Sequence, residues 1–297
     1  MRRLFCFGLG YTALALARRL IAEGWSVAGT TRATDKRARL AAEGLQVHLF
    51  DRDRPLRDPA AALAATTHLL TSIGPDELGD PVLDCHLADL QRCVSLQWIG
   101  YLGTTGVYGD RGGAWVDEGA AVAPTMPRTR RRAAAENRWL ESGLPVHVFR
   151  LAGIYGPGAG RNALEAVRAG TARRIIKPGQ VFGRVHVDDI VQVLRASIAR
   201  PNPGAIYNVA DNEPAPPQDV IAFACELLGV TPPPEVPYDE AELSPMARSF
   251  YADNRRIANV RIKRELGIRL RYPTYREGLR AILQQEAQSA AVAAASR

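Results

Sequence analysis

The order of apolar and polar positions at the start of the chain predicts strands that alternate with helices. The first unit has an apolar run at 4–7, a glycine turn at 8–10, a helical pattern at 12–23 and a second apolar run at 25–28. Short apolar runs indicate buried strands, and apolar residues that recur every three or four positions indicate an amphipathic helix. The unit is therefore a βαβ motif whose turn lies where a strand leads into a helix.

The same alternation continues along the chain and predicts the fold class. Further helical patterns and apolar runs follow one another at 35–43, 46–50, 59–65, 68–73, 81–94, 97–102, 128–142, 146–151, 187–199 and 205–209. Regular alternation of this kind predicts an α/β fold with a Rossmann-type, doubly wound parallel sheet. In such sheets ligands bind beyond the carboxyl ends of the strands.

The turn at 8–10 has the composition that a dinucleotide pyrophosphate requires. Gly8 permits a tight turn, and Gly10 lets main-chain N–H groups approach a pyrophosphate at the positive end of the helix. Ala13 takes a third small position, where helix and strand pack closely. Glycines also mark ordinary turns, so the alternative is a purely structural turn. Its place between two predicted strands favours cofactor binding.

The end of the second strand indicates which dinucleotide is bound. Thr30, Thr31 and Arg32 include no Asp or Glu to hold a ribose 2′-hydroxyl, whereas an arginine can bind a 2′-phosphate bidentately. We therefore expect NADP rather than NAD; the alternative is that Arg32 is an ordinary surface arginine. The remaining cofactor-binding candidates lie in the glycine turn or at strand ends: Tyr11, Thr12, Asp51, Ser72, Ile73 and Gly74. For Asp51 the alternatives are contact with the adenine and a helix cap.

Composition indicates a globular protein with a small-molecule ligand. The 297 residues are 46% hydrophobic, enough to bury a large core. The net charge of +7 comes almost entirely from scattered arginines, with one dense run at 128–132, which argues against nucleic-acid binding. The four cysteines show no CxxC spacing, so we expect buried reduced thiols. Cys85, Asp89 and Cys93 share a helical spacing, but packing is favoured over metal binding.

The beginning of the chain only superficially resembles a secretion signal. Its apolar stretch contains the glycine turn and is followed by Arg18 and Arg19. No run of about eighteen uncharged apolar residues occurs elsewhere in the sequence. We therefore expect a cytoplasmic protein without a membrane partner.

Four segments carry a resemblance to a known family. They read YLGTTGVYGD at 101–110, RLAGIYGPG at 150–158, RVHVDDI at 184–190 and YNVADNEP at 207–214. Together with the glycine turn they resemble the extended short-chain dehydrogenases/reductases of the NAD-dependent epimerase/dehydratase family. The resemblance implies a Rossmann domain with a smaller C-terminal substrate domain, an anionic substrate such as a nucleotide-sugar, and it allows a homodimer.

The resemblance also divides the chain. It implies that residues 1–156 and 184–212 form the NADP-binding domain, and that 157–183 and 213–286 form the substrate-binding domain. The proline-rich stretch 214–237 is expected to be irregular, and the Ala/Ser-rich stretch 287–297 to be a disordered tail.

The sequence departs from the family at its catalytic positions. Redox-active members carry a Ser or Thr after the fifth strand and a Tyr-x-x-x-Lys on the next helix. Thr104 matches the hydroxyl, but an alignment on the Ala-Ala-Glu at 134–136 places Arg128 and Arg132 at the tyrosine and lysine positions. The span 116–150 contains neither tyrosine nor lysine. Arg128 stays protonated near neutral pH and cannot act as a general acid or base.

Two explanations remain open. Either the protein is an enzyme whose acid is another residue, with Tyr108 and Tyr155 as candidates and the arginines gripping a substrate phosphate or carboxylate. Or it is a non-catalytic NADP-binding redox sensor or interaction protein, as found among atypical members of this superfamily.

A second polar group lies at 186–189. His186 beside Asp188 and Asp189 suggests acid–base chemistry, but the three precede an apolar helix, where such residues cap the helix start. A structural role is therefore favoured over one at the substrate pocket. Arg184 and Lys177 are candidates for positive charge there.

Overall fold

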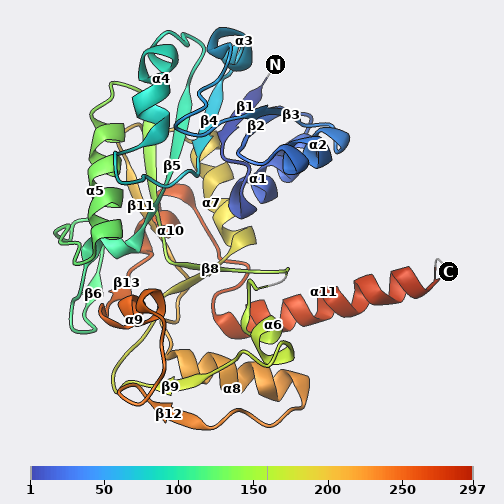
Figure 1. Cartoon of the computed structure of the whole chain (residues 1–297), viewed down its shortest axis with the longest axis vertical. Coiled ribbons are helices and arrows are strands. Elements are labelled where there is room, and N and C mark those ends of the chain that lie inside the picture. The colour runs from blue at the N-terminus through green and yellow to red at the C-terminus, as the bar shows by residue number, and fades with distance from the viewer. Residues whose placement is uncertain (1, 159, 296–297) are drawn as a thin grey trace.

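The computed structural model describes residues 2–158 and 160–295, and a seven-stranded parallel sheet forms its centre (Figure 1). The sheet has the order β11-β7-β5-β4-β1-β2-β3. Its strands are β1 (Arg3–Phe7), β2 (Ser26–Thr31), β3 (Gln46–Leu49), β4 (His68–Thr71), β5 (Trp98–Thr104), β7 (Val146–Leu151) and β11 (Ile206–Val209). The predicted Rossmann-type, doubly wound parallel sheet is confirmed.

Helices cover both faces of the sheet because both faces of its strands are apolar. In β1, Leu4 and Cys6 belong to one core cluster, which also contains residues of α1 (Tyr11–Ala22) and α7 (Val187–Ala199). Phe5 and Phe7 belong to the opposite cluster, with residues of α3 (Pro59–Leu63), α4 (Pro81–Gln91) and α5 (Pro127–Leu140). Alternate residues of a strand point to opposite faces, so this split places a helical layer on each side.

The order of the strands determines where a ligand can bind. From β1 the chain runs outward through β2, α2 (Thr34–Ala42) and β3, and then returns to place β4 on the other side of β1. The carboxyl ends of β1 and β4 therefore flank the point where the winding reverses. Open parallel sheets bind ligands at this point.

A second group of elements lies beyond the carboxyl edge of the sheet, at the bottom of Figure 1. It contains α6 (Ala163–Arg168), α8 (Pro217–Leu228), the paired strands β9 (Arg174–Ile176) and β12 (Glu235–Pro237), and the start of α11 (Tyr275–Ala295). Two further parallel pairs are β8 (Gly153–Tyr155) with β10 (Arg184–His186), and β6 (Trp115–Val116) with β13 (Arg256–Ile257). The remaining elements are η1 (Thr105–Tyr108), α9 (Pro245–Tyr251) and α10 (Val260–Leu266).

The expectation of irregular structure at 214–237 is wrong, because α8 occupies the middle of this stretch. Pro216 is the N-cap and Pro217 the first residue of the helix, where a missing N–H is no loss. Eleven residues without proline or glycine follow, and Gly229 ends the helix in the left-handed conformation. The prolines therefore mark where the helix begins.

Helix α11 continues to Ala295, into the stretch expected to be a tail, since alanine is the best helix former; residues 296–297 lie outside the described part. The cysteines are free thiols, with Cys6 and Cys225 buried and Cys85 and Cys93 partly exposed. In residues 2–158 and 160–295, no helix is both long and apolar enough to cross a membrane.

Candidate functional site

The glycine turn is fixed by the two strands that flank β1. Gly8 has a φ of +87°, a conformation that favours glycine. Its N–H donates to the Thr30 hydroxyl oxygen at 2.8 Å, and the Ser72 hydroxyl donates to its carbonyl oxygen at 2.6 Å. Thr30 and Ser72, expected to bind the cofactor, therefore hold the turn in place from β2 and from the end of β4.

The start of α1 is open for an anion. Gly10 is the N-cap, and no side chain caps the helix or places an acid in its first turn. Apart from its chain neighbours, a methyl group at Gly10 would meet one atom of the described residues within 4 Å, the Ser72 hydroxyl oxygen at 3.8 Å. Free N–H groups and the helix dipole favour a negative group at such a position.

Tyr11 and Thr12 differ in their surroundings. Thr12 is buried under the first turn of α1. The Tyr11 hydroxyl donates to the Pro157 carbonyl oxygen at 2.8 Å, and the guanidinium of Arg161 lies 4.8 Å from the centre of the Tyr11 ring. Tyr11 therefore links the start of α1 to the segment between β8 and α6.

At the outer end of the sheet, Thr31 is buried and Arg32 is exposed. The helix-cap alternative for Asp51 is wrong: Asp51 forms an ion pair with Arg54 at 2.7 Å, whereas the N-cap of α3 is Asp58. The local reason is a tight turn after β3, in which residues 51 and 54 form a β-bridge.

Beside the glycine turn, the end of β4 meets helix α5. Ile73 follows β4, and a methyl group at Gly74 would lie 3.3 Å from Nη1 of Arg132. Arg132 also donates through Nη2 to the Leu102 carbonyl oxygen and lies over the Tyr101 ring at 5.4 Å. Gly74 was expected at the cofactor and Arg132 at the catalytic site, and the structure places the two residues next to each other.

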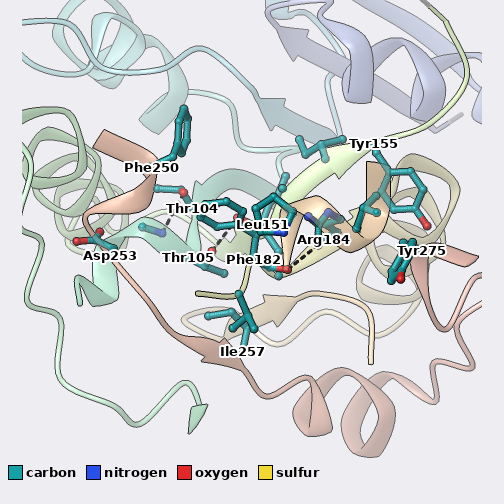
Figure 2. Close-up of a pocket in the computed structure, with 18 of the residues that line it drawn as sticks. Thr104, Thr105, Leu151, Tyr155, Phe182, Arg184, Phe250, Asp253, Ile257 and Tyr275 are labelled. Atoms are coloured by element: carbon teal, nitrogen blue, oxygen red, sulfur yellow. Dashed lines mark hydrogen bonds between the residues drawn. The ribbon is translucent and has the colours of Figure 1, made fainter. Parts of the chain in front are cut away.

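A cavity of about 810 Å³ opens at the carboxyl ends of β5 and β7 (Figure 2). Figure 2 shows Phe250 and Asp253 at one end and Tyr155 and Tyr275 at the other, with Thr104, Leu151 and Arg184 between them. Its walls come from β5, α5, β8, α6, β10, α8, α9 and α11. Thr104, Arg128, Arg132, Tyr155 and Arg184, all expected from the sequence, line it.

The cavity is strongly basic. Its described lining contains six arginines, Arg128, Arg132, Arg161, Arg173, Arg184 and Arg255, against the single carboxylate of Asp253. Asp253 is already engaged, since it accepts from the Thr125 hydroxyl at 2.7 Å and pairs with Arg255 at 3.0 Å. Arginine forks match carboxylates and phosphates, so the lining favours an anionic ligand.

Arg128 lies at the Phe250 end of the cavity. Its guanidinium is 4.0 Å from the centre of the Phe250 ring, and its Nε is buried with no hydrogen-bond partner in the described part of the chain. Burial lowers the pKa of Arg255, and the neighbouring charge of Arg128 lowers it further. Arg255 is already paired with Asp253, so Arg128 is the arginine at this end whose charge a bound anion could compensate.

Thr104, expected to contact the substrate, and Tyr155, one of the two candidate acids, line the cavity, whereas Tyr108, the other candidate acid, does not belong to its described lining. Thr104 caps η1 by accepting from the Gly106 N–H at 3.1 Å. The Tyr155 hydroxyl donates to the Thr274 carbonyl oxygen at 3.4 Å, and burial raises the Tyr155 pKa, so the phenol is protonated near neutral pH.

Tyr108 is fully buried behind the sheet edge. Its hydroxyl donates to the Asn208 side chain at 2.7 Å and accepts from Arg150 at 2.8 Å, and Arg150 is paired with Glu136. The hypothesis that Tyr108 supplies a proton at the cavity is therefore wrong, because its hydroxyl is buried and hydrogen-bonded to Asn208 and Arg150.

His186, Asp188 and Asp189 have the favoured structural role. His186 accepts from the Asp188 N–H at 3.2 Å as the N-cap of α7, and burial lowers the His186 pKa to about 4. Asp189 accepts from the main-chain N–H groups of Arg271 and Tyr272 at 2.7 and 3.0 Å. Lys177 donates to the Tyr251 carbonyl oxygen and does not belong to the described cavity lining.

Sequence reasoning missed Arg161, Arg173, Arg255 and Phe250. None lies in a motif, and in an arginine-rich chain nothing local separates them from surface residues. They become visible only when the segments that carry them meet at the cavity.

The fold and site define a Rossmann-type protein with a glycine turn at the switch point and a basic cavity beside it. No family model matches the chain. A conserved protein of unknown function from Silicibacter pomeroyi is 52% identical, with a TM-score of 0.89 over 96% of this chain and 99% of that chain. A structure from Methylobacillus flagellatus, assigned to the NAD-dependent epimerases/dehydratases, is 26% identical, with a TM-score of 0.72 over 96% and 98%. Protein YeeZ of Escherichia coli (strain K12) is 27% identical over 255 residues, 78% of this chain and 86% of YeeZ.

The chain is similar in fold and sequence to the NAD-dependent epimerases/dehydratases, which are extended short-chain dehydrogenases/reductases. It departs from their usual pattern, because the span 116–150 contains neither the tyrosine nor the lysine of a Tyr-x-x-x-Lys pair.

Proposed function

We propose that the protein binds a nicotinamide dinucleotide, NADP in preference to NAD, and acts on an anionic small molecule such as a nucleotide-sugar. The single observation that carries this proposal is the cavity at the carboxyl edge of the sheet, with six arginines against one carboxylate in its described lining. A guanidinium with free donors can form two parallel hydrogen bonds to a phosphate or carboxylate. A neutral substrate would leave these charges uncompensated.

The residues present fit a dinucleotide. The pyrophosphate would lie at the uncapped start of α1, where Gly10 leaves the main chain open. Arg32 would receive the 2′-phosphate, and the nicotinamide would lie near Gly74 and Arg132. The name of the Methylobacillus flagellatus relative as NAD-dependent supports a nicotinamide cofactor. When bound, the nicotinamide ring accepts or supplies a hydride.

The chain's own groups would bind and orient the substrate. Arg128 and Arg132 are four residues apart on α5 and line the same cavity, so both can contact one anionic group. Thr104 can donate its hydroxyl to a substrate oxygen while still accepting from Gly106. Tyr155 is the remaining candidate proton donor because it lines the cavity, although burial raises its pKa and so makes its phenol a weaker acid. We also propose that residues 157–183 and 213–286 form the substrate-binding domain, against 1–156 and 184–212 for the cofactor.

A second candidate function is a non-catalytic NADP-dependent sensor. It is favoured by one observation, which is that Arg128 and Arg132 replace the proton-relay pair. Neither arginine can exchange a proton near neutral pH. In this alternative the cavity binds an anion whose affinity depends on the oxidation state of the dinucleotide.

One experiment separates these possibilities. Purified protein is titrated with NADPH and NADH, and then screened with nucleotide-sugars while the nicotinamide absorbance is followed. Tighter binding of NADPH and an absorbance change with an anionic sugar support the enzyme. Binding of both ligands without any absorbance change supports the sensor, and equal affinity for NADPH and NADH contradicts the NADP preference.

A further inference from the structure

A tight turn after β3 places Arg54 next to the end of β2. The Phe50 N–H donates to the Thr31 carbonyl oxygen at 3.1 Å, which ties the two strand ends together. The main chains of residues 51 and 54 then exchange two hydrogen bonds, at 3.2 and 3.1 Å. This closed turn directs the chain back toward Arg32, at the edge where the adenosine half of a dinucleotide binds in such sheets.

The side chain of Arg54 connects both strand ends. Its Nη2 donates to the Asp51 carboxylate at 2.7 Å and to the Arg32 carbonyl oxygen at 2.8 Å. Nη1 makes no hydrogen bond within the described residues and stays available to a ligand, whereas Nε is buried without a partner. Its side chain is 43% exposed and that of Asp51 31%, which makes both reachable for a ligand.

Stability does not account for this arrangement. An ion pair at this exposure contributes about 0–1 kcal/mol. Its electrostatic effect on a ligand is larger, because a 2′-phosphate carries close to two negative charges near neutral pH, like other phosphate monoesters. A free Asp51 carboxylate beside Arg32 would repel such a phosphate and accept hydrogen bonds from a ribose hydroxyl instead.

We propose that Arg54 is a second residue that determines the preference for NADP, acting with Arg32 at the 2′-phosphate; this inference rests on the proposed NADP-binding function. Arg54 has three effects. It holds the main chain of Arg32 at the end of β2, it adds a cation there, and it occupies the Asp51 carboxylate, which would otherwise favour NADH.

The test measures NADPH and NADH affinities by fluorescence titration, which needs no substrate and no turnover. In the wild type NADPH binds more tightly. Arg54→Ala is expected to lower the NADPH-to-NADH affinity ratio at least tenfold, as expected when a charge-assisted contact is lost. Adding Asp51→Asn to Arg54→Ala should restore part of the ratio, because the unbalanced carboxylate is removed. Arg57→Ala is the matched control, since Arg57 is exposed, is close in sequence and has no ion pair in the described structure; its ratio should change less than twofold.

The outcomes separate this inference from the function on which it rests. The role of Arg54 is overturned if Arg54→Ala keeps the NADPH-to-NADH affinity ratio within twofold of wild type while Arg32→Glu loses most of it. The NADP preference itself then stands. Equal NADPH and NADH binding by the wild type overturns both. If Arg54→Ala fails to fold, Arg54→Gln keeps a donor for the Arg32 carbonyl without the charge, and an unchanged ratio in that variant refutes the inference.

Discussion

Alanine substitutions at Gly8 and Gly10 separate what the glycine turn does for folding from what it does for binding. Gly8 has a φ of +87°, and a methyl group there would lie 2.9 Å from Cγ1 of Ile73. The positive φ costs an L-residue about 1–2 kcal/mol, and the contact with Ile73 adds to this. Gly8→Ala should therefore destabilise the protein by about 2 kcal/mol or more.

Gly10→Ala should behave in the opposite way. Gly10 has φ −81° and ψ −168°, which any residue adopts, and its nearest neighbour would be the Ser72 hydroxyl at an ordinary 3.8 Å. Loss of glycine flexibility in the unfolded chain stabilises by about 0.4–1 kcal/mol, and alanine is a poorer N-cap by a similar amount. The two terms nearly cancel, so the free energy of unfolding should change by less than about 1 kcal/mol.

NADPH affinity should fall most in the Gly10 variants, although the free energy of unfolding changes least in Gly10→Ala. In Gly10→Ala the new methyl group stands where a pyrophosphate would contact the main chain, so NADPH affinity should drop at least tenfold, about 1.4 kcal/mol. Gly10→Val should abolish binding. Thermal unfolding and NADPH fluorescence titration on the same samples measure both quantities. Unchanged NADPH affinity in a folded Gly10→Ala protein would refute the placement of the cofactor, and a Gly8→Ala protein as stable as wild type would refute the conformational reasoning.

Three further predictions concern charged groups. Arg128→Ala should weaken binding of an anionic nucleotide-sugar about tenfold in calorimetry with little effect on NADPH, whereas Arg132→Ala should weaken both; equal effects on both ligands in Arg128→Ala would count against its place at the substrate. Burial raises the Asp211 pKa from 3.8 to about 8, so the unfolded chain releases this proton first and stability falls as pH rises between these values, by up to about 1.4 kcal/mol per unit. Asp211→Asn removes this loss, and its Tm advantage over wild type should grow from pH 5 to pH 8; a constant difference would contradict the burial argument. Glu136→Ala leaves a buried arginine unpaired and should lower the urea unfolding free energy by about 3–5 kcal/mol, so a loss below about 1 kcal/mol would show that the pair is dispensable.

The sheet could be predicted because its information is local. Each strand is a short apolar run and each covering helix has its own period, so β7 and α7 have the bounds that the pattern predicts. The parallel direction of the strands then follows, because each strand is connected to the next by a helix. Helix α8 was missed because two adjacent prolines are a signal for irregular structure and for a helix start alike, and only the following eleven residues distinguish the two cases.

The cavity could be predicted only in part. Arg128 and Arg132 could be proposed because an alignment on residues 134–136 places them at known motif positions. Arg255 and Arg54 lie in no motif, and nothing in the sequence shows that Arg255 lines the cavity or that Arg54 reaches the Arg32 carbonyl oxygen, 22 residues away. Tyr108 misled for the same reason, because the Arg150 that engages its hydroxyl lies 42 residues away in the sequence.

The wall that Tyr275 and Leu279 supply to the cavity has a consequence for synthesis on the ribosome. Thr104 and Arg128 are translated early, but the cavity stays open on one side until α11 has emerged and docked against α6 and α8. At about 5–20 residues per second, this delay is on the order of ten seconds or more. During that interval β7 and β11 join the sheet, whereas the glycine turn has been translated before it begins. The opening at the glycine turn would therefore form before the enclosure at the far side of the cavity.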